Sequence, residues 1–241
     1  NTVNYSNAVA TSNAGIRIQS FKTTDAATGN LVGVNKGMIN LNNGSENVGI
    51  YAYDVENTNN IMGGNSYKIL GQNTATGIIN VAGTKNIGMM AEDKSGTTAT
   101  NFETVIENSG KINVKGTSSI GMYTKDKYSK AKQLATGTIV ASSNNVGVVN
   151  NGVFDFTGGI TANGTNSVGV YSANGINSVT NIGSGTANLA TLTVTNGGVG
   201  LYADAGSTQT LKGLNATVLG TNNAGSILFY NLPKTGTNKG F

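Results

Sequence analysis

Side chains that could carry out catalysis are few and scattered. The 241 residues include no His, Cys or Trp, which removes the imidazole and thiol groups used most often as bases, nucleophiles and zinc ligands. Eleven Asp and Glu residues are spread along the chain, and the one adjacent pair, Glu92 and Asp93, would point to opposite faces of a strand. Glycan-cleaving enzymes need clustered carboxylates or calcium-binding acids. We therefore expect a protein that is not an enzyme and uses no cofactor or metal.

Basic side chains could instead bind an anionic ligand. Six lysines fall within residues 111–132, where Asp126 is the only acid, and four of them are close neighbours: Lys125, Lys127, Lys130 and Lys132. Such a patch could attract sialylated or sulfated glycans, and the alternative is a solvated face that keeps the protein soluble. Arg17 is the only arginine and basic residues are not interleaved with aromatic ones, so nucleic acid is not expected as a partner.

Tyrosines form the second candidate set. Four of them stand two residues after a glycine: Tyr51, Tyr123, Tyr171 and Tyr202. A tyrosine offers a flat apolar ring with a hydrogen-bonding tip, so an aligned row could contact sugars or a protein surface. The alternative is a structural row whose rings stack on one another.

These glycines mark an internal repeat. A hexapeptide such as Asn47–Ala52 or Ser119–Thr124 recurs, and its central glycines are Gly15, Gly49, Gly88, Gly121, Gly147, Gly169, Gly200 and Gly225. Eight to eleven residues before seven of these glycines begins a triplet with apolar or small first and third residues, namely Ile39/Leu41, Ile79/Val81, Ile112/Val114, Ile139/Ala141, Ile160/Ala162, Leu192/Val194 and Leu214/Ala216. Both segments alternate with period two, which indicates strands.

The shortest repeat shows what the strands build. Between Gly147 and Gly169 a third alternating run, Val153–Phe156, follows the turn-forming Asn151 and Gly152. Three short strands and three turns make one coil of a parallel β-helix. The sequence thus predicts a single all-β segment of about eight coils over residues 1–241, with three strands per coil.

Alternation also predicts which side chains enter the core. Val48, Ile50 and Ala52 would face inward, while Gly49 and Tyr51 would face outward. Half of the chain, 120 residues, is Gly, Asn, Thr or Ser, which suits tight corners and stacked polar ladders. An outward asparagine row is expected at Asn40, Asn80, Asn113 and Asn215, and a matching threonine pair at Thr161 and Thr193.

Repeat length varies mainly after the tyrosine-containing strand. The long inserts are residues 53–74, 92–107, 125–133 and 173–187. Insertions at one position of a solenoid project from one side, often the binding side. We expect loops on one side of the rod, with drift at a tolerant corner as the alternative.

The whole pattern resembles the passenger domains of type V autotransporter adhesins, particularly the large fusobacterial ones, whose repeats are similar to residues 110–123 here. The resemblance spans residues 13–228 and implies a right-handed β-helix. It further implies an extracellular, cell-surface location, with the parent protein anchored by a separate C-terminal outer-membrane barrel. In that setting the segment would bind a host receptor, a glycan or a partner bacterium.

Other functions remain open on the sequence. The first alternative is a β-helical polysaccharide-degrading enzyme, the second a purely structural spacer, and an amyloid-type Asn-rich assembly is a third. A match to the sortase signal, Leu232–Gly236, raises a sortase-anchored wall adhesin as a further alternative.

Overall fold

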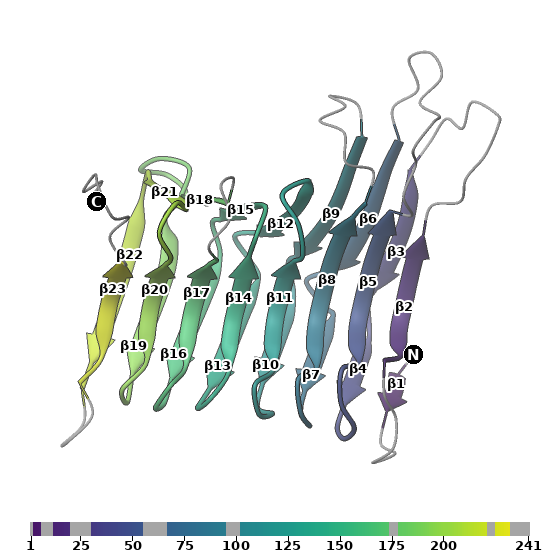
Figure 1. The fold of residues 1–241 in the computed structure, drawn as a ribbon, viewed down its shortest axis with the longest axis horizontal. Helices are drawn as coiled ribbons and strands as arrows, with labels where there is room; N and C mark the ends of the chain where they lie inside the picture. The colour runs from purple at the N-terminus through teal and green to yellow at the C-terminus, as the bar shows by residue number, and fades with distance from the viewer. Residues whose placement is uncertain are drawn as a thin grey trace.

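The computed structural model describes residues 2–5, 12–19, 30–54, 67–94, 102–173, 178–220 and 225–231, with the side chains of 2–5, 67, 68, 102, 103 and 231 excepted. These residues form strands joined by turns (Figure 1). Among them, no helix has the length and apolar composition needed to cross a bilayer. The Leu232–Gly236 motif lies outside the described residues.

Three parallel sheets run along the molecule. The first sheet contains β1 (Thr2–Tyr5), β4 (Met38–Leu41), β7 (Ile78–Val81), β10 (Lys111–Val114), β13 (Thr138–Ser142), β16 (Gly159–Asn163), β19 (Ala190–Thr195) and β22 (Leu214–Leu219). The second contains β2 (Ala14–Gln19), β5 (Val48–Asp54), β8 (Ile87–Asp93), β11 (Ile120–Thr124), β14 (Val146–Asn150), β17 (Val168–Ser172), β20 (Val199–Ala203) and β23 (Ile227–Asn231). The third contains β3 (Leu31–Asn35), β6 (Tyr67–Asn73), β9 (Phe102–Asn108), β12 (Ser129–Gln133), β15 (Val153–Phe156), β18 (Val179–Ile182) and β21 (Thr208–Leu211).

The first seven coils each take one strand from each sheet in chain order, and the last described coil consists of β22 and β23. Every strand pairs in parallel with its equivalents in the adjacent coils. Figure 1 shows the eight second-sheet strands side by side along the rod. The predicted right-handed parallel β-helix with three strands per coil is confirmed.

The core is a stack of apolar side chains from all three sheets. The triplets from Ile39/Leu41 to Leu192/Val194 are buried on the first sheet, as predicted. In the last coil the predicted triplet Leu214/Ala216 is displaced by two residues. Leu192 pairs with Ala216, not with Leu214, and Thr193 pairs with Thr217. Asn215 therefore lies beside Thr191 and does not belong to the asparagine row.

The hexapeptide glycines face inward, which corrects the predicted alternation. A Cβ built on Gly121 would lie 3.0 Å from Ile139 Cγ2 in the core and 2.5 Å from the backbone oxygen of Gly147 in the next coil. Met122, the next residue, also faces inward and is buried, whereas Ile120 is half-buried and lies outside the core cluster. Alternation thus breaks at the glycine, and the first apolar residue of the hexapeptide turns outward.

The last predicted repeat glycine is misplaced. Val199 pairs with Ile227 and Leu201 with Phe229, so Leu228 occupies the position beside Gly200, not Gly225. Leu228 and Phe229 pack against the core. The glycine row therefore ends one coil before the last described strand.

Left-handed backbone recurs at the corner between the first and second sheets. Seven non-glycine residues there have φ between 54° and 61°: Ser12, Glu46, Lys85, Ser118, Asn144, Asn166 and Asn196. Five of these corner residues are followed by the Asn or Ser of a buried row, in which the backbone N–H of Asn47 donates to Asn86 Oδ1 at 2.9 Å and that of Ser119 to Asn145 Oδ1 at 2.9 Å. These bonds satisfy buried donors at the corner.

Amide ladders join the coils at two further places. On the outer face of the first sheet, Asn80 donates to Asn40 at 2.7 Å and Asn113 to Asn80 at 2.8 Å, as the sequence predicted. A buried ladder at the end of the third sheet was not predicted, and it runs through Asn35, Asn73, Asn108 and Gln133 with bonds of 2.8, 2.8 and 2.9 Å.

The long inserts follow the second sheet, as expected, but they contain the strands of the third sheet. β6, β9, β12 and β18 lie in or at the end of the four inserts. The variable connections themselves are therefore shorter, with residues 55–66 between β5 and β6 and residues 94–101 between β8 and β9. The two longest connections, residues 20–30 between β2 and β3 and residues 55–66 between β5 and β6, both lie at this corner.

Candidate binding face on the second sheet

One register position of the second sheet carries the candidate tyrosines. Consecutive pairings align Arg17, Tyr51, Met90, Tyr123, Val149, Tyr171, Tyr202 and Tyr230. The structure therefore brings the four predicted tyrosines into one column and adds Tyr230, which the sequence reasoning missed because its repeat lacks the glycine. From Tyr51 on, these side chains are half-buried, apart from a buried Met90 and Tyr230, which is 41% exposed.

A second column runs beside the first because alternation breaks at each glycine. It consists of Ala14, Val48, Ile87, Ile120, Val146, Val168, Val199 and Ile227. None of these side chains belongs to the core cluster: Val48 is buried, Ile227 is 43% exposed and the others are half-buried. We call the two columns together the apolar strip. Large contiguous apolar surfaces are typical of interaction sites.

Tyrosine hydroxyls on the strip bond to the next coil by a common rule. The partner lies two residues beyond the column position of the following coil, so Tyr51 donates to Glu92 and Tyr171 donates to Asp204 Oδ2 at 2.5 Å. In the middle of the strip Asn151 Nδ2 donates to the Tyr123 hydroxyl at 3.4 Å. These bonds hold the ring tips along one edge of the strip.

The rings also contact one another along the rod. The centroids of Tyr171 and Tyr202 are 5.1 Å apart in an edge-to-face arrangement, and those of Tyr202 and Tyr230 are 5.0 Å apart and stacked. At the other end, the Arg17 guanidinium lies 5.6 Å from the Tyr51 ring centroid, a cation–π distance. These ring contacts join tyrosines of successive coils along the rod.

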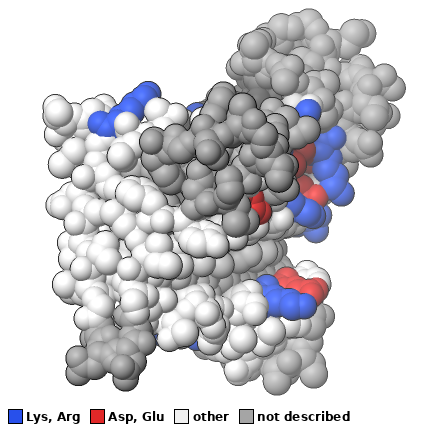
Figure 2. Space-filling model, turned by 60° about the vertical axis from the view of Figure 1, so that its left-hand side comes forward, with Lys and Arg blue, Asp and Glu red and all other residues white. Residues whose placement is uncertain are grey.

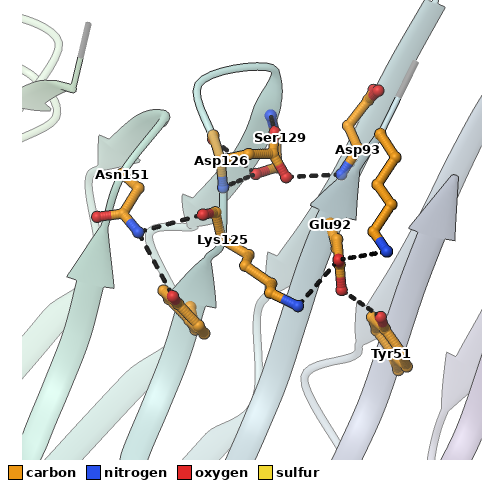
Figure 3. A network of polar contacts seen from close by, with 9 residues as sticks. Tyr51, Glu92, Asp93, Lys125, Asp126, Ser129 and Asn151 are labelled. Atoms are coloured by element: carbon orange, nitrogen blue, oxygen red, sulfur yellow. Dashed lines mark hydrogen bonds and ion pairs between the residues drawn. The ribbon is translucent and has the colours of Figure 1, made fainter. Parts of the chain in front are cut away.

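Glu92 is the charged centre of the face. Figure 3 shows its carboxylate between Tyr51 and Lys125, and the Lys125 ammonium donates at 2.9 Å while Lys94 lies at 3.6 Å. Burial acts to raise the pKa of Glu92, but hydrogen bonds from Tyr51 and Lys125 outweigh it and hold that pKa below its usual value. Burial and the Glu92 bond raise the pKa of Tyr51 well above its usual value.

A second polar cluster, formed around Asp93 and Asp126, lies beside this network at the ends of β8 and β11. Asp126 accepts from the backbone N–H of Asp93 at 2.7 Å and from those of Tyr128 and Ser129 at 2.9 and 3.0 Å (Figure 3). Asp93 in turn accepts from the Thr104 hydroxyl at 3.1 Å. Burial raises the pKa of Asp126 despite these backbone donors. The pair thus ties the ends of β8 and β11 to β9.

The predicted lysine patch is divided between two faces. Lys125 belongs to the Glu92 network, whereas Lys130 and Lys132 lie on the outer face of the third sheet, 3.1 Å from Asp155 and 2.8 Å from Glu107. Lys127 lies over the Tyr128 ring at 4.7 Å. Figure 2 shows acidic and basic side chains interspersed along one edge of the visible face, a separate basic group near the opposite upper corner, and white surface between them. Three of the four lysines thus have carboxylate partners on neighbouring coils.

The described residues hold no group of three or more acidic side chains placed to bind a metal ion. Comparison with models of protein families, with curated proteins and with solved structures returns no match for this chain. Fold and face together define a β-helical rod with an apolar strip on one of its three faces.

The Tyr171–Asp204 bond predicts a shifted ionisation. The hydrogen bond to Asp204, followed by burial, raises the pKa of Tyr171 from 10.0 to about 12. This stabilisation is complete below pH 10 and is lost as the pH rises through about 12. We expect Asp204→Asn to return the Tyr171 pKa toward 10, measured as the phenolate absorbance that disappears in Tyr171→Phe. Asp155→Asn, on the third sheet, is the control and should leave it unchanged.

The Lys125–Glu92 ion pair predicts that part of the stability of the fold is lost in acid. Because the Glu92 pKa is lowered in the fold, its stabilisation is present above its ordinary value of 4.5 and is lost as the pH falls through the folded pKa. Lys125→Met should lower the free energy of unfolding by about 1 kcal/mol at neutral pH. In urea titrations the free energies of unfolding of the variant and the parent chain should converge as the pH falls below the folded pKa of Glu92. Exposed Lys115→Met is the control, and an equal loss there would contradict the assignment.

Proposed function

We propose that the chain is a segment of an extracellular bacterial adhesin, a β-helical rod that presents a binding face. The observation that supports it most is the apolar strip, which extends over all eight strands of the second sheet. The core of the rod is already filled by other apolar side chains, and a continuous outward strip of Val, Ile and Tyr is typical of a surface that a partner covers. The partner class we propose is a host receptor, a glycan or another bacterium, and the location is the cell surface.

The proposal assigns the chain no catalytic role. Glu92, Glu107 and Asp155 are paired with lysines across coils, and Asp126 and Asp204 accept hydrogen bonds from neighbouring coils. Such carboxylates support the stacking of coils. The repeated sequence pattern and its likeness to autotransporter passenger domains support the surface location.

Binding of the labelled chain to host cells, to a glycan array and to bacteria would test the proposal. Tyr202→Lys places a charge in the strip, and Thr193→Lys places one on the half-buried outer face of the first sheet in the same coil. We expect Tyr202→Lys to reduce binding at least tenfold and Thr193→Lys to leave it unchanged. Equal binding by both variants and the parent chain would contradict a role for this face.

A further inference from the structure

We propose that the partner of the apolar strip is a second copy of this chain, docked face to face with its rod axis reversed. The inference rests on the proposed function, because it names the partner of the same face. It follows from three properties of the strip, namely its period, its charges and its area.

The period of the strip makes it complementary to itself. The two columns repeat at the coil spacing of about 4.8 Å, so a second strip offers the same period. A two-fold axis along the strands, between β11 and β14, reverses the rod and sets the tyrosine column of one copy against that of the other. The column positions then meet as Arg17 with Tyr230, Tyr51 with Tyr202, Met90 with Tyr171, and Tyr123 with Val149.

Three of these four meetings join side chains that complement each other in charge, size or polarisability. Arg17 would reach the exposed Tyr230 ring, a cation–π pair like the one it makes with Tyr51 in its own chain. Bulky Tyr123 would meet the smaller Val149 beside the axis. Met90 would meet the Tyr171 ring, and such sulfur–aromatic contacts are favourable.

Charge selects this orientation over the parallel one. The charged side chains described on or beside the strip are Arg17, Glu46, Lys85, Glu92, Lys94, Lys125 and Asp204. With the axes reversed, the coil of Arg17 faces that of Tyr230, the coil of Lys125 faces that of Asn151, and the coil of Asp204 faces that of Tyr51. With the axes parallel, each coil would face the same coil of the other copy, so each charged side chain would lie at the same height along the rod as the identical side chain of its partner. Like charges at one level repel.

The area is sufficient for a weak dimer. Eight strands of about five residues give a flat face of about 38 by 17 Å, or about 650 Å² per copy. Two copies then bury about 1,300 Å², at the lower end of specific interfaces. We therefore expect a dimer that dissociates on dilution.

Sedimentation velocity of the purified chain, without any other ligand, tests association. We expect dimers that become monomers on dilution. Val149→Lys, next to the proposed axis, should shift the dimer dissociation constant upward at least tenfold. Val140→Lys is the matched control, because it substitutes a half-buried valine of the same coil on the first sheet. A monomer at all concentrations, or equal dimerisation by the two variants, overturns the proposal.

Cross-linking tests the orientation, and it does not depend on the folding of the lysine variant. The chain has no cysteine, so Tyr51→Cys and Tyr202→Cys each introduce a unique thiol. Facing sheets lie about 10 Å apart, beyond the roughly 7 Å Cα separation of a disulfide, so a short dithiol-reactive linker is used. We expect products in the mixture of the two variants and little from either alone.

Two other results would each identify a different mode of association. A Tyr51→Cys chain cross-linked to itself indicates parallel pairing, and species larger than dimers in the sedimentation experiment indicate end-to-end association. Either result overturns the proposed pairing. A parent chain that is monomeric at all concentrations yet binds cells would leave the proposed function standing without this partner, whereas a parent chain that dimerises without binding cells would do the reverse.

Discussion

Gly121→Ala is expected to lower the free energy of unfolding by about 3 kcal/mol or more. The added methyl group would lie 2.5 Å from the backbone oxygen of Gly147 and 3.0 Å from Ile139 Cγ2. Because the oxygen belongs to the backbone of the next coil, relief requires the two coils to separate. The same contact occurs in every coil from Gly15 to Gly200, at 2.5 to 2.7 Å.

Urea unfolding followed by circular dichroism would measure the loss. Gly225→Ala is the control, because a Cβ there meets no atom within 4 Å and its φ lies outside the left-handed region. We expect that variant to be as stable as the parent chain. A Gly121→Ala loss below 1 kcal/mol would show that the coils separate at little cost, and the assigned role of the glycine row would be wrong.

Asn73→Ala is expected to cost about 3 kcal/mol through the buried amide ladder. Asn73 accepts from Asn35 and donates to Asn108, both at 2.8 Å, and all three side chains are buried. Removing it breaks both ladder bonds, together with contacts of 3.3 and 3.5 Å to the Gly77 and Lys111 oxygens, and leaves Asn35 Nδ2 with a 3.4 Å contact to the Ile78 oxygen. Buried amides without good partners are costly, because water cannot replace the lost bond.

Asn80→Ala provides the matched comparison on the outer ladder. Asn80 also accepts one amide bond and donates another, at 2.8 and 2.7 Å, but it is half-buried. Solvent can replace these bonds, so we expect a loss of at most about 1 kcal/mol in the same urea titration. Equal losses for the two variants would mean that burial does not set the strength of these ladders.

Much of the fold could be predicted because each repeat shows the same succession of residue types. The triplets such as Ile79/Val81 and the hexapeptides such as Asn47–Ala52 are short stretches of alternating residues, so each can be recognised as a strand from its own sequence. The outer row Asn40, Asn80 and Asn113 followed from the triplets, since each asparagine is the middle residue of one. Local patterns of this kind specify a strand and its partner without tertiary information.

The outward turn of the second column could not be predicted by alternation. Ile120 and Met122 are both apolar, so the sequence does not show that one faces solvent and the other the core. The break at Gly121 arises from the approach of the next coil, which leaves no room for a Cβ. In the last coil, the shift of the first-sheet register and the replacement of glycine by Leu228 escaped detection for a related reason, because local spacing was used to align strands that pair only in space.

The sequence by itself determined a parallel β-helix, its number of coils, most of its core positions and the alignment of four tyrosines. The tertiary structure decided which side chains meet across coils, because connections of unequal length separate the equivalent residues. Lys130 reaches Asp155, and Tyr171 reaches Asp204, only through the register between coils. That register divided the lysines between two faces and joined the tyrosines and valines into one strip, so the candidate site depends on stacking that no local pattern contains.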